Sequence, residues 1–125
     1  MSPLILLVDD DPLIRSLGKE LLEHLGYEVE AAGNGREALE SYRRLGKVDL
    51  VILDYYLPDR DGFQVLQDLL AFDPGVRVLM ASGFFPSRKA DLTREIGAAG
   101  LIYKPYRLAE FEDRIREVLQ VGPFS

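Results

Sequence analysis

The sequence predicts an α/β protein built on a doubly wound, open parallel sheet. Short, continuously apolar segments alternate along the chain with segments whose apolar residues recur at helical spacing. Continuous apolar runs are typical of strands buried on both faces, and such strands occur in parallel sheets covered by helices. Five strands alternating with five helices and joined by right-handed crossovers leave the doubly wound sheet as the leading arrangement.

The expected strands end at polar residues or turns, and the expected helices have one apolar face. We expect strands at residues 4–8, 27–32, 50–53, 76–81 and 101–103, and helices at residues 12–25, 36–45, 63–72, 86–97 and 108–119. In the first helix, Leu13, Leu17 and Leu21 recur every four residues and predict the inner stripe. The fourth helix is the most polar, and Leu92 and Ile96 indicate its inner face.

Length and composition narrow the classes of function. The chain has 125 residues, which is close to the commonest size of one domain. Fifteen Lys and Arg against twenty-one Asp and Glu give a net charge of −6, which disfavours direct binding to nucleic acid. The absence of cysteine excludes disulfides, thiolate zinc sites and a cysteine nucleophile. Because no apolar run reaches about 20 residues, we expect a cytoplasmic protein that does not enter membranes.

Chemically reactive side chains stand where the expected strands end. They are Asp9 and Asp10 after the first strand, Asp54 after the third, Ser82 after the fourth and Lys104 after the fifth. In a doubly wound sheet the carboxyl ends of the strands share one rim, and ligands bind there. We therefore expect these side chains to converge on that rim.

Each of these residues also has an ordinary structural explanation. Asp11, the third acid of the first run, is explained as the N-cap of the first helix. Asp54 could initiate a turn before Pro58, and Ser82 and Lys104 could simply end strands. A purely structural explanation fits the group poorly, because clustered carboxylates need a cation to offset their charge.

The chemistry that fits this set is the transfer of a phosphoryl group to a carboxylate. Carboxylate oxygens at close quarters suit Mg²⁺, which commonly shares its ligand shell with phosphate oxygens. With the cation at Asp9 and Asp10, Asp54 is placed to act as the nucleophile. Lys104 would pair with one phosphoryl oxygen as a point charge, and Ser82 would donate a hydrogen bond to another.

Together these residues resemble the receiver domains of two-component response regulators, over essentially the whole chain. The motifs are Val8-Asp9-Asp10-Asp11, Asp54 with Leu57-Pro58 and Asp61-Gly62 downstream, Ser82, and Lys104-Pro105. Each motif alone is a weak signal, but all of them in this order at strand ends are specific. The resemblance implies a flavodoxin-like fold of strand order 2-1-3-4-5, with residues 1–125 forming a single receiver domain.

The resemblance also implies the roles of individual residues. Asp54 would accept a phosphoryl group from the phosphohistidine of a histidine kinase or histidine phosphotransfer protein. Asp10 and Asp54 would bind Mg²⁺ directly, the backbone carbonyl of Tyr56 would be a further ligand, and Asp9 would act through water. Phosphorylation would switch the face formed by the fourth helix, fifth strand and fifth helix. The chain would not be an enzyme beyond its own phosphoryl transfer and dephosphorylation.

The expected switch departs from the family pattern. In the family, the hydroxyl that ends the fourth strand, here Ser82, pairs with an aromatic residue on the fifth strand. The matching position, three residues before Lys104, is Leu101. Tyr103 is aromatic and falls on the same side of the strand as Leu101. Its alternative role is packing beneath the last helix, so the aromatic switch is not expected in its usual form.

Aromatic residues flank the expected phosphorylation site. Tyr56 lies two residues beyond Asp54, and Phe84 lies two residues beyond Ser82. In receiver domains these positions influence how readily water reaches the acyl phosphate. We hypothesise that Tyr56 and Phe84 screen the phosphoryl group and slow its hydrolysis; a loop contact or a partner surface is the alternative.

Two further patterns carry less weight. Gly33-Asn34-Gly35 lacks the spacing of a phosphate-binding loop and is interpreted as a turn. Asp59-Arg60-Asp61-Gly62 is similar to the start of a calcium-binding loop, but its closing position is Leu70 instead of glutamate. Neither pattern is therefore assigned a ligand.

Two other functions remain as alternatives. A phosphohydrolase of the haloacid-dehalogenase type would also use Asp54 as nucleophile, but it needs a second aspartate where this chain has Tyr56. A flavin-binding module would need a loop rich in glycine and hydroxyl groups after the first strand, where this chain has three aspartates.

If the chain is a receiver, a homodimer through the fourth helix, fifth strand and fifth helix is a further option. The receiver could be a stand-alone regulator, or it could be part of a longer regulator or of a hybrid histidine kinase.

Overall fold

Strands and helices alternate along the chain in the computed structural model, which describes residues 2–83, 89–104 and 108–121. The strands are β1 (Leu4–Val8), β2 (Glu28–Ala32), β3 (Leu50–Asp54), β4 (Val78–Ser82) and β5 (Gly100–Tyr103). The helices are α1 (Pro12–His24), α2 (Gly35–Leu45), α3 (Gly62–Phe72), α4 (Lys89–Ile96) and α5 (Leu108–Val121). The predicted alternation of five strands with five helices is confirmed.

The strands form one parallel sheet in the order β2-β1-β3-β4-β5. Val8 of β1 lies opposite Leu53 of β3, and Asp54 of β3 lies opposite Ala81 of β4. Because neighbouring strands run in the same direction, their carboxyl ends meet at one rim. The predicted doubly wound, flavodoxin-like fold with order 2-1-3-4-5 is confirmed.

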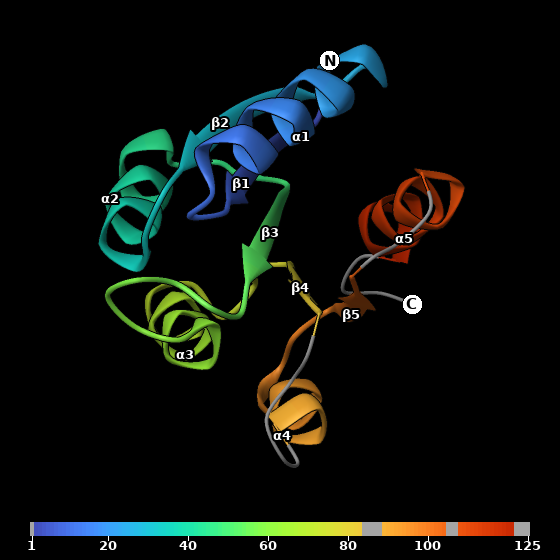
Figure 1. Ribbon diagram of the computed structural model, residues 1–125. Helices are drawn as coiled ribbons and strands as arrows, with labels where there is room; N and C mark the ends of the chain where they lie inside the picture. Colours follow the sequence, from blue (N-terminus) through green and yellow to red (C-terminus); the bar gives the residue numbers. More distant parts are fainter. Residues whose placement is uncertain (1, 84–88, 105–107, 122–125) are drawn as a thin grey trace.

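The sheet is covered on both faces, as Figure 1 shows, with α1 and α5 on one side and α2, α3 and α4 on the other. Successive strand residues point to opposite faces. In β1, Leu6 packs in the core beneath α2, α3 and α4, whereas Leu7 packs in the core beneath α1 and α5. This two-sided burial explains why the strands are apolar along their whole length.

Helix α1 departs from the prediction at its N-terminal half. Asp11 caps the helix as expected, because its carboxylate accepts hydrogen bonds from the N–H groups of Leu13 and Ile14. The predicted inner positions are nevertheless wrong for two leucines, since Leu13 is 66% exposed and Leu17 is 53% exposed. The buried contact to the sheet comes later in the helix, from Leu22.

Two other helices begin or pack differently from the prediction. The segment interpreted as a turn contains the N-cap of α2: the side chain of Asn34 accepts from the N–H of Glu37, whose carboxylate accepts from the N–H of Gly33. In α4, Leu92 is 38% exposed and does not form the inner face. Thr93, the next residue, is fully buried instead.

Strand β4 begins at Val78 instead of residue 76, although Val76 is still buried in the core. None of the helices in the described part of the chain has the length and apolarity needed to cross a bilayer.

Candidate functional site

Three aspartates meet at the rim formed by the carboxyl ends of β1 and β3. Asp54 is the last residue of β3, and Asp9 and Asp10 follow β1, its neighbour in the sheet. One carboxylate oxygen from each aspartate lies within 4.8 Å of the other two. The structure thus brings together the three acids that the strand-end argument selects.

Lys104 joins this group from the edge strand β5, which β4 separates from β3. It follows β5, and its backbone N–H donates to the carbonyl of Ser82 at the end of β4. Its ammonium Nζ lies 3.3 Å from Asp9 Oδ2 and 3.4 Å from Asp54 Oδ2. The side chains of Asp9 and Asp54 are only 9% and 12% exposed, so solvent screens these ion pairs less than it screens surface pairs.

The charge balance of the site shows in the titration of Asp54. Burial raises the pKa of the Asp54 carboxyl above its ordinary value; the Lys104 ammonium opposes the shift, and the Asp9 charge adds to it. The cost of burial therefore outweighs the stabilisation by Lys104. A divalent cation would remove this imbalance, because Lys104 offsets one of three negative charges.

The donor set fits Mg²⁺. Asp9, Asp10 and Asp54 offer oxygen atoms only, and these lie close enough together to hold one small cation, directly or through its waters. Asp10 is the exposed member of the group, so the rim is open to water, and Mg²⁺ usually retains several waters. The residues present are thus suited to hold the cation that the sequence predicts.

The loop after β1 is held by a residue that the sequence analysis did not select. Arg15 Nη1 on α1 donates to the backbone carbonyl of Asp9 at 2.8 Å. The Asp9 carboxylate in turn accepts from the N–H of Asp11. Together these bonds fix the turn that carries Asp9 and Asp10. Arg15 lies in a segment whose apolar residues have helical spacing, and nothing in that local sequence indicates a contact with Asp9.

The expected switch residues lie close to the acidic site but differ in burial. Ser82 ends β4 and is buried, and its partner in the register of β5 is Tyr103. Leu101 is buried in the core beneath α2, α3 and α4, opposite Met80. Tyr103 is 49% exposed, in contrast to its buried strand neighbours Leu101 and Ile102. Leu101 therefore fills the position expected for a switch aromatic with a buried aliphatic side chain.

Tyr56 lies at the edge of the site. Its N–H donates to Asp54 Oδ1 at 3.4 Å, and its backbone pairs with Asp61 in an isolated antiparallel bridge. The residue is 49% exposed, and its ring packs edge to face against the ring of the buried Tyr55, with centroids 4.9 Å apart. The second expected screening residue, Phe84, lies outside the described residues.

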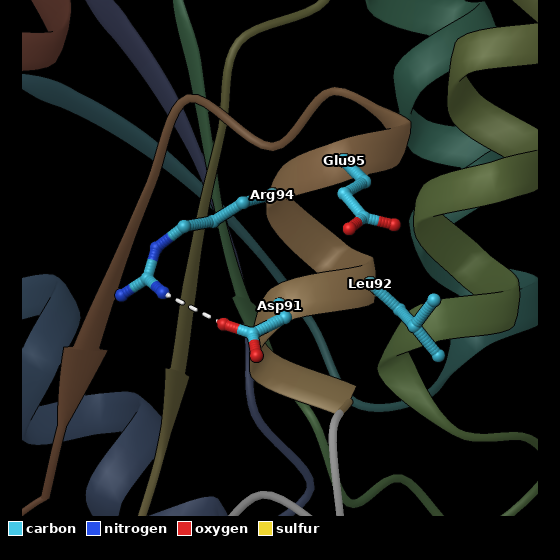
Figure 2. Close-up of a pocket in the computed structure, with 4 residues that line it drawn as sticks. All are labelled: Asp91, Leu92, Arg94 and Glu95. Carbon is cyan, nitrogen blue, oxygen red and sulfur yellow. Dashed lines mark ion pairs between the residues drawn. The ribbon is translucent and has the colours of Figure 1, made fainter.

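A pocket of about 320 Å³ lies elsewhere, on helix α4. Asp91, Leu92, Arg94 and Glu95 line it. Figure 2 shows the Asp91–Arg94 ion pair along the helix and Leu92 pointing towards α3. None of the predicted site residues lines this pocket, so it is not the site of the expected chemistry.

Known proteins are similar to this chain in both sequence and fold. A family model described as the response regulator receiver domain matches residues 5–116. The chemotaxis protein CheY of Halobacterium salinarum is 34% identical over 119 residues, which cover 95% of this chain and 98% of that protein.

Solved structures extend this similarity to three dimensions. A response regulator receiver domain protein from Clostridium thermocellum has a TM-score of 0.90 at 27% identity, over 95% of each chain. The response regulator protein TrrA from Thermotoga maritima, solved in complex with Mg²⁺ and BeF, has a TM-score of 0.84 at 32% identity. That match covers 94% of this chain and 99% of the other.

Proposed function

This chain belongs to the response regulator receiver domain family, a family of two-component signalling modules, and on that premise we propose that it is a phosphorylation switch whose phosphoacceptor is Asp54. The position of Asp54 is the main support. It ends β3 at the rim of the sheet, beside Asp9 and Asp10 and within 3.4 Å of Lys104. A nucleophilic carboxylate, a cation site and a fixed ammonium are the parts that phosphoryl transfer to an acid requires.

The proposed reaction takes a phosphoryl group from a phosphohistidine. One Asp54 oxygen attacks the phosphorus, the new oxygen–phosphorus bond forms, and the phosphorus–nitrogen bond breaks with its electron pair returning to the imidazole. Asp10, Asp54 and the Tyr56 carbonyl would hold Mg²⁺ directly, and Asp9 would hold it through water; the cation, when bound, would offset charge on the phosphoryl oxygens. Lys104 would contact one phosphoryl oxygen, because its ammonium already reaches Asp54. The Ser82 hydroxyl, at the end of the adjacent strand, would donate to another.

We assign the approach of the phosphodonor protein to the N-terminal half of α1. This helix starts directly after the acidic residues, and Leu13, Ile14 and Leu17 are 66%, 45% and 53% exposed on it. A protein that delivers a phosphohistidine to Asp54 must cover the rim, and these apolar side chains would be buried by it. Histidine kinases draw phosphate from ATP in the cytoplasm, so we also place this chain there.

A comparison of two phosphodonors tests the role of α1. For a kinase domain that phosphorylates the wild type, Leu17→Ser should slow transfer about tenfold, the effect of losing about 1.4 kcal/mol of binding. The same substitution should leave phosphorylation by acetyl phosphate unchanged. Phe72→Ser is the matched control, because Phe72 is 52% exposed on α3. Equal slowing by both variants would contradict the assignment.

We propose a second copy of the chain as the partner of the face formed by α4, β5 and α5. Tyr103 of β5 and Leu108 of α5 are exposed by 49% and 51%. The same face carries both signs of charge, as in the Asp91–Arg94 and Arg116–Glu112 pairs, which suits the self-complementary contact of a two-fold dimer. Light scattering after treatment with Mg²⁺ and beryllium fluoride should give the dimer mass, and Tyr103→Glu should restore the monomer. A monomer in both samples would contradict the dimer.

Phosphorylation itself is tested by intact-protein mass spectrometry. Incubation with phosphoramidate and Mg²⁺ should add the mass of one phosphoryl group to the wild type and none to Asp54→Asn. The variant keeps the size of the side chain, so its fold is preserved. A folded wild type that gains no mass would overturn the proposal, and rapid turnover of phosphomonoesters would favour the haloacid-dehalogenase alternative.

A further inference from the structure

The loop between β3 and α3, residues 55–61, is fastened to the start of α2 through Asp59. Asp59 Oδ1 accepts from the N–H of Gly35 at 2.8 Å, and Asp59 Oδ2 accepts from the N–H of Arg36 at 2.9 Å. The first N–H groups of a helix have no partner within the helix, and negative charge is favourable there. Asp59 thus satisfies two such groups from a position 24 and 23 residues away in the chain.

The absence of a side chain at Gly35 makes this contact possible. A Cβ atom on Gly35 would lie 2.7 Å from both Cγ and Cδ of Arg60, and 2.9 Å from a methyl group of Val65. Arg60 therefore lies directly over the start of α2. Its guanidinium pairs with Asp59 at 3.5 Å and with Asp68 on α3 at 3.3 Å. The tip of the loop is held between two helices.

The other end of the same loop reaches the acidic site. The Tyr56–Asp61 bridge closes the loop, and the N–H of Tyr56 donates to the Asp54 carboxylate. The loop tip, residues 57–60, lies between these bridge residues, so its attachment to α2 restricts the backbone of Tyr56. A change at Asp59 can therefore reach the site through three peptide units.

We propose that Asp59 is a positioning residue for divalent-cation binding: its double hydrogen bond to Gly35 and Arg36 holds the Tyr56 peptide in the orientation that the site requires. This inference rests on the proposed function, in which the Tyr56 carbonyl contributes to the cation site. The charge on Asp59 suits the role, because the hydrogen bonds from Gly35 and Arg36 lower its pKa in spite of the opposing effect of desolvation. Asp59 itself touches neither the cation nor the phosphoryl group.

The Mg²⁺ dependence of phosphorylation by acetyl phosphate tests this role. Asp59→Ala should raise the half-saturating Mg²⁺ concentration about tenfold, the lower end of effects seen when a residue that orients a metal ligand is removed. The rate at saturating Mg²⁺ should stay near that of the wild type. Asp59→Asn retains one acceptor oxygen and should show a smaller shift. Gly35→Ala should reproduce the shift, because the added Cβ displaces Arg60 and the loop tip.

Tyr42→Phe separates positioning from general loss of stability. Tyr42 on α2 donates to Asp73, after α3, at 2.6 Å, so its loss loosens the same pair of helices away from the loop tip. This variant should lower the melting temperature but leave the half-saturating Mg²⁺ concentration unchanged. If Asp59→Ala and Asp59→Asn also leave that concentration unchanged, the inference is wrong. A wild type that Mg²⁺ does not activate would instead refute the proposed function.

Discussion

The Lys104 ammonium lies 3.4 Å from the Asp54 carboxylate, although β4 separates the strands that carry the two residues. The lysine side chain reaches across a whole strand, which a shorter cationic side chain could not do. Because Asp54 is buried and Asp9 is also within 3.3 Å of Lys104, this contact sets the charge balance of the site.

Removal of the Lys104 charge should impair phosphoryl transfer. In Lys104→Met the aliphatic stem is preserved, but neither Asp54 nor the incoming phosphoryl group has the ammonium as counter-ion. We expect phosphorylation by acetyl phosphate at saturating Mg²⁺ to slow by about 10²-fold or more, the usual cost of losing one preorganised charge partner. Lys47→Met, at an exposed position after α2, is the control and should react at the wild-type rate. Equal rates for the two variants would show that Lys104 is not part of the reaction.

Mg²⁺ should stabilise the folded protein through Asp10. A cation that binds only the folded state adds about 2.7 kcal/mol to the free energy of unfolding at one hundred times its Kd. Asp10→Asn removes one carboxylate at an exposed position and should abolish most of this stabilisation without disturbing the core. Thermal unfolding with and without Mg²⁺ measures the effect. An undiminished Mg²⁺ shift in Asp10→Asn would place the cation elsewhere.

Asp54 should destabilise the metal-free protein at neutral pH. Burial raises the pKa of Asp54 in the folded state, so the folded protein holds this proton more tightly than the unfolded chain does. Stability is therefore lost as the pH rises from the unfolded pKa through the folded one, and the loss persists above it. In EDTA, Asp54→Asn should be more stable than the wild type near neutral pH, and the difference should shrink in acid.

The control for this measurement is Asp113→Asn, because Asp113 is exposed on α5 and its loss changes the net charge equally. Urea unfolding of the wild type and both variants across the acidic to neutral range gives the three stability curves. A neutral-pH stability of Asp54→Asn below that of the wild type would contradict the proposed charge imbalance.

Tyr56 should lengthen the lifetime of the phosphorylated protein. Its backbone N–H donates to the Asp54 carboxylate and the residue is half exposed, so its ring is available to hinder the approach of water. We expect Tyr56→Asn to lose its phosphoryl mass several times faster than the wild type after the donor is removed. Tyr103→Asn is the matched control, because Tyr56 and Tyr103 are both 49% exposed, and it should keep the lifetime of the wild type. An unchanged lifetime in Tyr56→Asn would rule out screening by this ring.

The site could be predicted from the sequence because its residues are marked locally. Asp9, Asp54 and Lys104 each follow a recognisable buried strand, and parallel strands bring their carboxyl ends to one rim. The order of the strands then decides which residues meet, and the resemblance to receiver domains supplied that order. The position of the acids thus needed no information beyond strand ends and topology.

The orientation of α1 could not be predicted in the same way. Leucines spaced four residues apart drift by about 40° around a helix at each step, since a turn takes 3.6 residues. Over the stretch from Leu13 to Leu21 this drift is enough to turn the first leucines away from the face that packs on the sheet. The exposure of Leu13 and Leu17 follows from it.

The contact between Asp59 and the start of α2 has no local signal. Asp59 and Gly35 are 24 residues apart, and each lies in a segment typical of an ordinary turn. The contact depends on Gly35 lacking a side chain at the point where Arg60 crosses the start of the helix, which only the packed structure reveals. Tertiary contacts of this kind decide loop positions that secondary-structure patterns leave open.

The location of the phosphoryl group tests the central claim most directly. Aspartyl phosphate is reduced by borohydride to homoserine, whereas an unmodified aspartate is not. After phosphorylation with phosphoramidate and Mg²⁺, borohydride treatment and digestion, peptide sequencing by mass spectrometry should find homoserine at position 54. Homoserine at position 9 or 10, or its absence from a protein that has gained phosphoryl mass, would contradict Asp54 as the phosphoacceptor.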